Sequence, residues 1–110
     1  MNLREFVILD AMNIATARYQ RHPRDWKTKS LAERLRYRGF QATAAQVAEV
    51  LLEDERLAEI GQFTHLTSRE VGETLGRMAQ GYPERRAPLV EKLDTRHWRL
   101  TDAGVEALSA

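Results

Sequence analysis

The chain has 110 residues, of which 43% are hydrophobic and 30% are charged, and it contains no cysteine. A chain of this length can bury one core but not two, so we expect a single soluble domain spanning residues 1–110. The lack of cysteine excludes disulfide scaffolds, thiol catalysis and cysteine-based zinc sites, and it favours a reducing, cytoplasmic location. Charged residues surround the short apolar run near the N-terminus, so neither a signal peptide nor a membrane span is expected there.

The formal net charge is only +1, but the charges are unevenly distributed along the chain. Residues 16–40 carry eight basic and two acidic side chains, whereas residues 41–62 carry five acidic side chains and one basic. This segregation favours one surface that attracts phosphate and another that avoids phosphate or meets a protein partner. Two solvated helix faces would give the same pattern. Arginine supplies 14 of the 17 basic residues, which favours bidentate contacts with phosphate or base edges.

The first predicted helix runs from Leu3 to about Tyr19, within the N-terminal segment 1–20, and its apolar residues form two stripes. One stripe comprises Leu3, Val7, Ile14 and Ala17, and the other, almost opposite, comprises Ile8, Met12, Ala15 and Tyr19. A helix that is apolar on two sides must bury both of them. We therefore expect the second stripe to pack against a second copy of the chain in a homodimer. Burial of this helix at the centre of the monomer is the alternative.

A loop with Pro23 is predicted at residues 20–29, followed by a helix from about Leu31 to Arg38 that Gly39 ends. Thr43, with Gln46 three residues later, predicts a capping box for a helix from Thr43 to about Asp54. The residues expected on its inner side are Val47, Val50 and Leu51. Residues 56–63 are predicted to form a short strand or an irregular return.

The strongest helix start is Thr67 with Glu70, which predicts a helix from Thr67 to Gln80 that Gly81 ends. Its inner stripe comprises Val71, Leu75 and Met78, and its outer face comprises Arg69, Gly72, Glu73, Gly76, Arg77 and Gln80. Glycine in a helix costs about 1 kcal/mol relative to alanine. The two glycines on one face therefore favour the close approach of another molecule to this helix.

Two short strands are predicted at Leu89–Leu93 and Arg96–Leu100, and they form a hairpin around Asp94 and Thr95. Trp98 is expected in the core at the root of this hairpin. Thr101 is predicted to cap a last short helix.

Two segments in the second half of the chain resemble winged helix-turn-helix regulators of the broad MarR and PadR kind. They are residues 66–81, LTSREVGETLGRMAQG, and residues 89–108, LVEKLDTRHWRLTDAGVEAL. The positions that carry the resemblance are Leu66, Thr67, Val71, Leu75, Val90, Glu91, Arg96, Trp98, Leu100, Thr101 and Gly104. The resemblance implies a mainly α fold, a winged helix-turn-helix with a small two-stranded β-hairpin wing, in which residues 67–101 supply the recognition helix and the wing.

The resemblance implies binding to double-stranded DNA. In the major groove, arginine suits guanine and glutamine suits adenine. The residues expected at the DNA are Arg69, Glu73, Arg77 and Gln80 on the helix, Lys92, Arg96, His97 and Arg99 on the wing, and Arg34, Arg36 and Arg38 beside the duplex. Glu73 is expected either to hold Arg69 and Arg77 in position or to read a cytosine amino group. An exposed helix whose arginine and glutamate side chains merely pair is the structural alternative.

Residues 31–54, with their own turn at Gly39, form a second candidate helix-turn-helix. The second helix of that pair ends in carboxylates, which phosphate groups would repel, so residues 67–80 are favoured as the reading helix.

The expected function is sequence-specific binding of double-stranded DNA by a homodimer, as a small transcriptional regulator or a plasmid- or virus-type DNA-binding factor. The alternative is a winged-helix adaptor or inhibitor that acts on replication, segregation or transcription machinery and binds its protein partner through the acidic segment. The three histidines show no metal-ligand spacing, and no nucleophile, paired-carboxylate or phosphate-loop pattern is found. No enzymatic activity, cofactor or metal is therefore expected.

Overall fold

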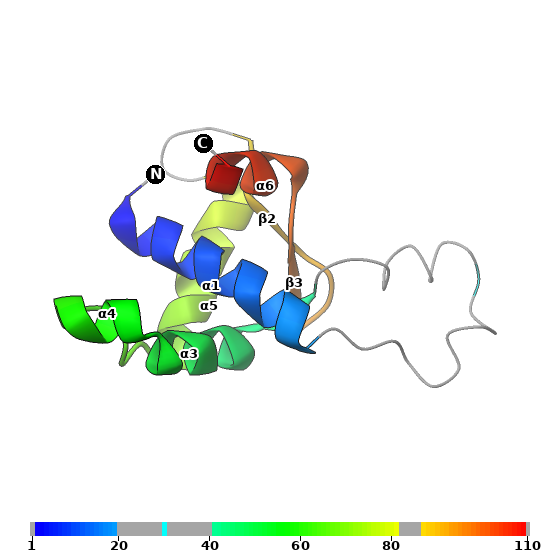
Figure 1. Ribbon diagram of the computed structural model, residues 1–110. Coiled ribbons are helices and arrows are strands. Elements are labelled where there is room, and N and C mark those ends of the chain that lie inside the picture. The colour runs from blue at the N-terminus through cyan, green and yellow to red at the C-terminus, as the bar shows by residue number, and fades with distance from the viewer. Residues whose placement is uncertain (1, 20–29, 31–40, 82–86, 110) are drawn as a thin grey trace.

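The computed structural model describes residues 2–19, 30, 41–81 and 87–109, and this part of the chain is mainly helical (Figure 1). The elements in chain order are α1 (Leu3–Tyr19), β1 (Ala42–Thr43), α3 (Ala44–Glu53), α4 (Glu55–Ile60), α5 (Ser68–Gln80), β2 (Val90–Lys92), β3 (His97–Leu100) and α6 (Asp102–Ser109). The predicted helix at 31–38, with Arg34, Arg36 and Arg38, lies outside the described residues.

The three strands form one antiparallel sheet in the order β1-β3-β2. β2 and β3 make the predicted hairpin, in which Lys92 lies opposite Trp98 and Glu91 lies opposite Arg99. β1 pairs with the other edge of β3, where Ala42 also lies opposite Trp98. The sequence did not predict β1, because two residues are too few to show the alternation typical of a strand.

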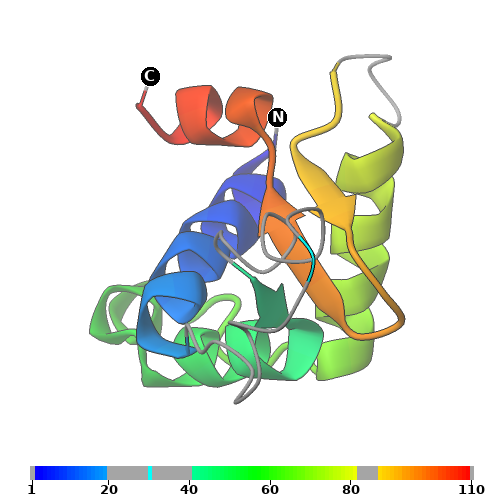
Figure 2. The ribbon, with the colours of Figure 1, turned by 90° about the vertical axis from the view of Figure 1, so that its right-hand side faces the viewer.

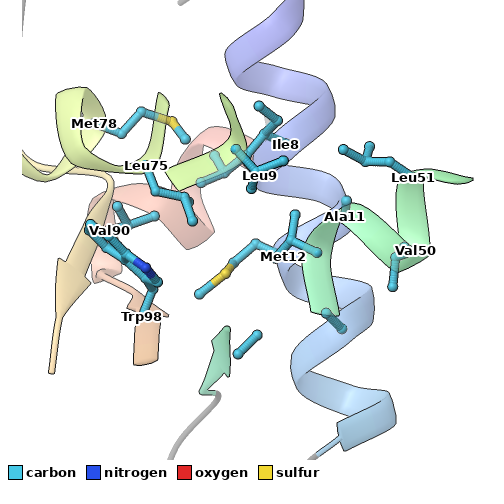
Figure 3. Close-up of a cluster of buried hydrophobic side chains, with 14 of the residues drawn as sticks. Ile8, Leu9, Ala11, Met12, Val50, Leu51, Leu75, Met78, Val90 and Trp98 are labelled. Carbon is cyan, nitrogen blue, oxygen red and sulfur yellow. The ribbon is translucent and has the colours of Figure 1, made fainter. Parts of the chain in front are cut away.

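α1 lies at the centre of the core, against α3, α5, α6, β1 and β3. Ile8, Met12 and Ala15 are completely buried within the monomer. Figure 3 shows Ile8 and Met12 among side chains from α3, α5 and the hairpin. The prediction that this stripe contacts a second copy is therefore wrong for these three residues. The alternative position at the centre of the monomer is correct, because neighbouring elements of the same chain already cover the stripe. The side chain of Tyr19, the fourth member, lies outside the described part.

The opposite stripe of α1 is only partly covered by the monomer. Val7 and Ile14 are half-buried against the core, whereas Leu3 and Ala17 are exposed. The two apolar stripes of α1 therefore differ in role, and only one of them organises the core.

The predicted capping boxes start α3 and α5 where the sequence placed them. The Thr43 hydroxyl accepts a hydrogen bond from the Gln46 amide at 3.1 Å, and the Thr67 hydroxyl accepts one from the Glu70 amide at 3.2 Å. α5 ends at Gly81, whose φ of +69° is the left-handed conformation that glycine adopts without steric cost. The predicted inner residues are buried on both helices, as expected: Val47, Val50 and Leu51 on α3, and Val71, Leu75 and Met78 on α5.

Residues 55–60 form the helix α4, so the prediction of a strand or an irregular return at 56–63 is wrong. The Asp54 carboxylate caps this helix by accepting a hydrogen bond from the Arg56 amide at 2.9 Å. Gly61 ends it in the left-handed conformation, and Leu57 anchors it in the core. Asp54 and Gly61 are ordinary helix-boundary residues, and they were the available sequence signal for α4.

α6 is held tightly against the segment that enters the hairpin. The Thr101 hydroxyl accepts a hydrogen bond from the Gly104 amide at 3.1 Å, which is the predicted cap, and the Thr101 amide donates to the Leu89 carbonyl oxygen at 3.1 Å. Gly104 is buried in this contact. A Cβ atom at position 104 would collide with the Leu89 carbonyl oxygen, so glycine is needed there for the close approach of two backbones.

Gly104→Ala is expected to destabilise the protein by about 2 kcal/mol or more, because a backbone atom cannot move aside as a flexible side chain can. Thermal unfolding followed by circular dichroism should show a lower midpoint. Val105→Ala, on the exposed side of the same helix, is the control and should change the stability by about 0.5 kcal/mol or less. An unchanged midpoint for Gly104→Ala would contradict the close packing of α6.

Candidate nucleic-acid interface

The polar face of α5 lies on the molecular surface. The side chain of Arg69 is 87% exposed and that of Glu73 is 56% exposed. Arg77 and Gln80 are exposed farther along the same helix. Because Val71, Leu75 and Met78 bury the opposite side of α5, these polar side chains are directed away from the core.

Arg69 and Glu73 form an ion pair one turn apart, with 3.4 Å between the Arg69 Nε and the Glu73 Oε1 atoms. Both side chains are well exposed, so water and salt screen the attraction. An exposed pair of this spacing contributes only about 0.3–0.5 kcal/mol. The ion pair is therefore too weak to explain by itself why two charged residues occupy this face.

Gly72 and Gly76 lie on the same face, and the fold requires glycine at neither position. Neither residue has a positive φ, since Gly61 and Gly81 are the described glycines that do. A Cβ atom at Gly76 would have no neighbour within 4 Å, and one at Gly72 would lie 3.8 Å from the Ala44 Cβ atom, an ordinary contact. The two glycines leave the backbone of α5 accessible from outside.

A hollow of about 710 Å³ separates the first turns of α5 from the hairpin turn. Figure 2 shows the hairpin running alongside α5, with its turn near one end of the helix. The hollow is lined by Thr43, Ala44, Ala45, Ser68, Arg69, Gly72, Glu73, Lys92, Thr95, Arg96 and Trp98. It therefore brings together three basic side chains, Arg69 from α5 and Lys92 and Arg96 from the hairpin.

Trp98 holds one of these basic groups in place. The Lys92 Nζ atom lies 5.1 Å from the centre of the Trp98 ring, a distance at which the ring attracts the ammonium group. Trp98 is only 7% exposed, which confirms its expected place in the core at the root of the hairpin. Trp98 thus lines the hollow as a fixed part of the fold.

The first turns of two helices also border the hollow. Thr43 caps α3, Ala44 and Ala45 begin it, and Ser68 begins α5. The first backbone amides of a helix have no partner within the helix, and they carry partial positive charge that favours anions. The start of α3, whose first turn has no acidic residue, therefore adds to the positive potential in the hollow, whereas the Glu70 carboxylate in the first turn of α5 offsets that of α5.

Asp94 shapes the turn of the hairpin. Its carboxylate accepts hydrogen bonds from the backbone amides of Arg96 at 2.8 Å and His97 at 2.9 Å, and it lies 3.0 Å from the His97 Nδ1 atom. These contacts of the Asp94 carboxylate fix the three residues of the turn that precede β3. As a result Arg96 is directed to the hollow, while His97 is occupied by the turn itself.

The predicted DNA-contacting residues divide into four groups. Arg69, Glu73, Lys92 and Arg96 meet at the hollow, and Arg77 and Gln80 extend the exposed face of α5 beyond it. Two other predicted residues do not line the hollow, because His97 contacts Asp94 and Arg99 pairs with Glu91 at 3.0 Å. His97 and Arg99 therefore do not join the group at the hollow, and their expected contacts with DNA stay a prediction. The predicted flanking residues Arg34, Arg36 and Arg38 are not among the described residues.

The sequence did not indicate the contribution of α3 to this site. Thr43 was identified as a helix cap, but its closeness to Ser68 and Arg69 depends on how α3 packs against α5. The place of Trp98 beside Lys92 was not predicted either. The predicted turn at Asp94 and Thr95 would set Lys92 opposite His97, whereas the turn includes Arg96 as well and sets Lys92 opposite Trp98.

Comparison with known proteins finds no matching family model, no matching curated protein and no matching solved structure. Among the described helices, none has both the length and the apolar character needed to cross a membrane. Within the same part of the chain, no group of three or more histidine, aspartate or glutamate side chains is placed to hold a metal ion.

The hydrogen bonds from the Arg96 amide, together with those from His97, lower the pKa of the Asp94 carboxyl from its ordinary 3.8 to about 2. A pKa that is lower in the folded chain than in the unfolded chain means that the carboxylate stabilises the fold. This contribution is complete above about pH 4 and is lost as the pH falls toward 2. Titration of the side-chain carboxyl signal by NMR should give a midpoint near 2.

His97→Ala is the control for this titration, because the Arg96 amide is the larger cause of the shift. The variant should keep the pKa of Asp94 below its ordinary value. A midpoint close to 4 in the unmodified protein would show that Asp94 does not organise the turn.

Proposed function

We propose that this chain binds double-stranded DNA as a winged-helix protein, with α5 as the recognition helix and the β2–β3 hairpin as the wing. The observation that carries the proposal is the exposed polar face of α5, which continues into a hollow lined by basic side chains of the hairpin. One surface thus offers a helix for a groove and positive charges for the phosphates beside it.

The order of the elements supports this interpretation. A helix, a short strand, three helices and a hairpin follow one another, and the first strand joins the hairpin at β3 (Figure 1). α4 occupies the segment where a simple turn would connect the two helices of the motif. The additional helix lengthens this connection without separating α3 from α5, which remain packed together.

The chemistry of the α5 face suits the major groove, which is about 12 Å wide and admits an α-helix. Arg69 and Arg77 would donate to guanine, and Gln80 would pair with adenine. Gly72 and Gly76 would let the helix backbone approach the base edges. α3 is less suited to this role, because its exposed side carries Glu49 and Glu53.

The hairpin and the start of α3 would contact the phosphates. Lys92 and Arg96 would neutralise phosphate charge, and the first amides of α3 would donate to phosphate oxygens. Such contacts fix the position of the protein on the duplex without reading its sequence. Affinity should therefore fall steeply as the salt concentration rises.

Within this proposal the chain acts as a small transcriptional regulator or a plasmid- or virus-type factor. A homodimer would use a surface other than the buried stripe of α1.

A second candidate is an adaptor that binds a protein partner through the acidic segment. The observation that favours it is exposed apolar surface on α3 and α4, where Leu52 is 60% exposed and Ile60 is 54% exposed. Exposed acidic side chains accompany them on both helices. This surface does not include the polar face of α5, so variants can separate the two functions.

The double variant Arg69→Ala with Arg77→Ala should weaken duplex binding by about 30-fold or more, because it removes two contacts of about 1 kcal/mol or more each. Fluorescence anisotropy with a pool of labelled duplexes measures the change. The matched control is Arg18→Ala with Arg56→Ala, which alters the net charge equally at a different hollow beside α1 and α4. Equal losses in both double variants would argue against α5 as the reading helix, and a protein partner that the α5 double variant retains would favour the adaptor.

Gly76→Ala separates stability from binding. The added methyl group meets no neighbour within the protein, so the variant should be more stable by about 0.5–1 kcal/mol. The same methyl group should obstruct close approach to the duplex and lower the affinity. Chemical denaturation and anisotropy on the same sample test both effects. An alanine variant that is more stable and binds DNA as well as the original would remove the functional reason for glycine.

A further inference from the structure

A carboxylate stands in the middle of the basic surface proposed to meet DNA. Glu73 lines the hollow together with Arg69, Lys92 and Arg96, and Arg77 lies one turn farther along α5. Duplex DNA is a dense array of negative charge, so a carboxylate on this surface weakens binding to phosphate. Glu73 needs a compensating contact if this face of α5 binds nucleic acid.

The fold does not supply a sufficient reason for Glu73. Its side chain is 56% exposed, and its ion pair with Arg69 is screened by water. The neighbouring acidic residue of α5, Glu70, differs in this respect. Glu70 completes the capping box with Thr67, and its carboxylate lies 3.9 Å from Arg4. The carboxylate of Glu70 is therefore engaged within the protein, whereas that of Glu73 is presented to the outside.

The base edges of the major groove offer a suitable partner. The cytosine N4 amino group donates a hydrogen bond that a glutamate can accept, and guanine offers the O6 and N7 acceptors that an arginine prefers. A C·G base pair presents both patterns side by side. The Arg69–Glu73 pair has the complementary pattern, with a guanidinium that donates and a carboxylate that accepts.

The position of the pair on α5 allows this contact. Four residues of a helix span about 6 Å along its axis, so Arg69 and Glu73 can reach the same base pair or adjacent base pairs. Gly72 and Gly76 flank Glu73 without side chains, and the space beside Gly76 is open. The Glu73 carboxylate can therefore reach a base edge without obstruction from its neighbours on this face.

We propose that Glu73 is a specificity-determining residue that selects a C·G base pair by accepting a hydrogen bond from cytosine N4, while Arg69 donates to guanine in the same or the next base pair. This inference rests on the proposed function and names the class of duplex that the same surface recognises. The negative charge of Glu73 lowers the affinity for duplexes that lack this base pair, so Glu73 acts by discrimination more than by attraction.

Selection from a random duplex pool, with the full chain and its variants, tests the inference. The unmodified chain should enrich duplexes with cytosine at one fixed position, by about 5- to 150-fold over the other bases. Glu73→Ala should lose the preference at that position and keep it elsewhere. Glu73→Gln should shift it toward adenine, which glutamine reads. Glu106→Gln, on α6, removes the same charge elsewhere and should keep the original motif.

The outcomes distinguish failure of the proposed DNA binding from failure of the proposed role of Glu73. If the original chain retains no duplex, the proposed function and the inference both fail. If it retains duplexes without base preference, or if Glu73→Ala selects the unchanged motif, DNA binding stands and the inference fails. Loss of the preference at every position in Glu73→Ala, with folding unchanged by circular dichroism, would make Glu73 a positioning residue for the arginines and would also overturn the inference.

Discussion

The described structure depends on the burial of one face of α1. Ile8, Leu9 and Met12 lie in the core between α3 on one side and α5 with the sheet on the other (Figure 3). Burying apolar surface is the main favourable contribution to folding, and these contacts bring together segments that are distant in the sequence. α1 packs against both α5 and β3, and α5 also contacts β2 directly. The position of α5 beside the hairpin, and so the hollow between them, depends on these contacts together.

α5 illustrates how one helix divides its tasks. Its apolar stripe is anchored in the core, its first turn is fixed by the Thr67–Glu70 capping box, and its last turn ends at Gly81. None of these constraints involves the opposite face of α5. On that face the sequence places charged residues and two glycines that the fold does not require. Glycines lower the stability of a helix, so two glycines without a role in the fold are the physical basis of the functional proposal.

Local chemistry made much of this arrangement predictable. α3 and α5 were identified because their capping residues act within one turn, and their inner faces follow from helical periodicity. Tertiary features were not predictable in the same way. The two apolar stripes of α1 show that both faces need cover, but not whether the monomer or a second copy provides it. β1 is stabilised by pairing with β3, and its own two residues carry no pattern. At the site, helical periodicity identified Arg69 and Glu73. The ion pairs of His97 with Asp94 and of Arg99 with Glu91, which keep both residues outside the hollow, were not predictable from the sequence.

The most direct test of the account is an NMR titration of the labelled protein with duplex DNA, followed through the backbone amide signals. The account predicts that the largest shifts fall on α5, the hairpin turn at residues 94–96 and the first turn of α3, with small shifts on α4. Shifts concentrated on α4 and the acidic end of α3, or no shifts at any DNA concentration, would contradict it.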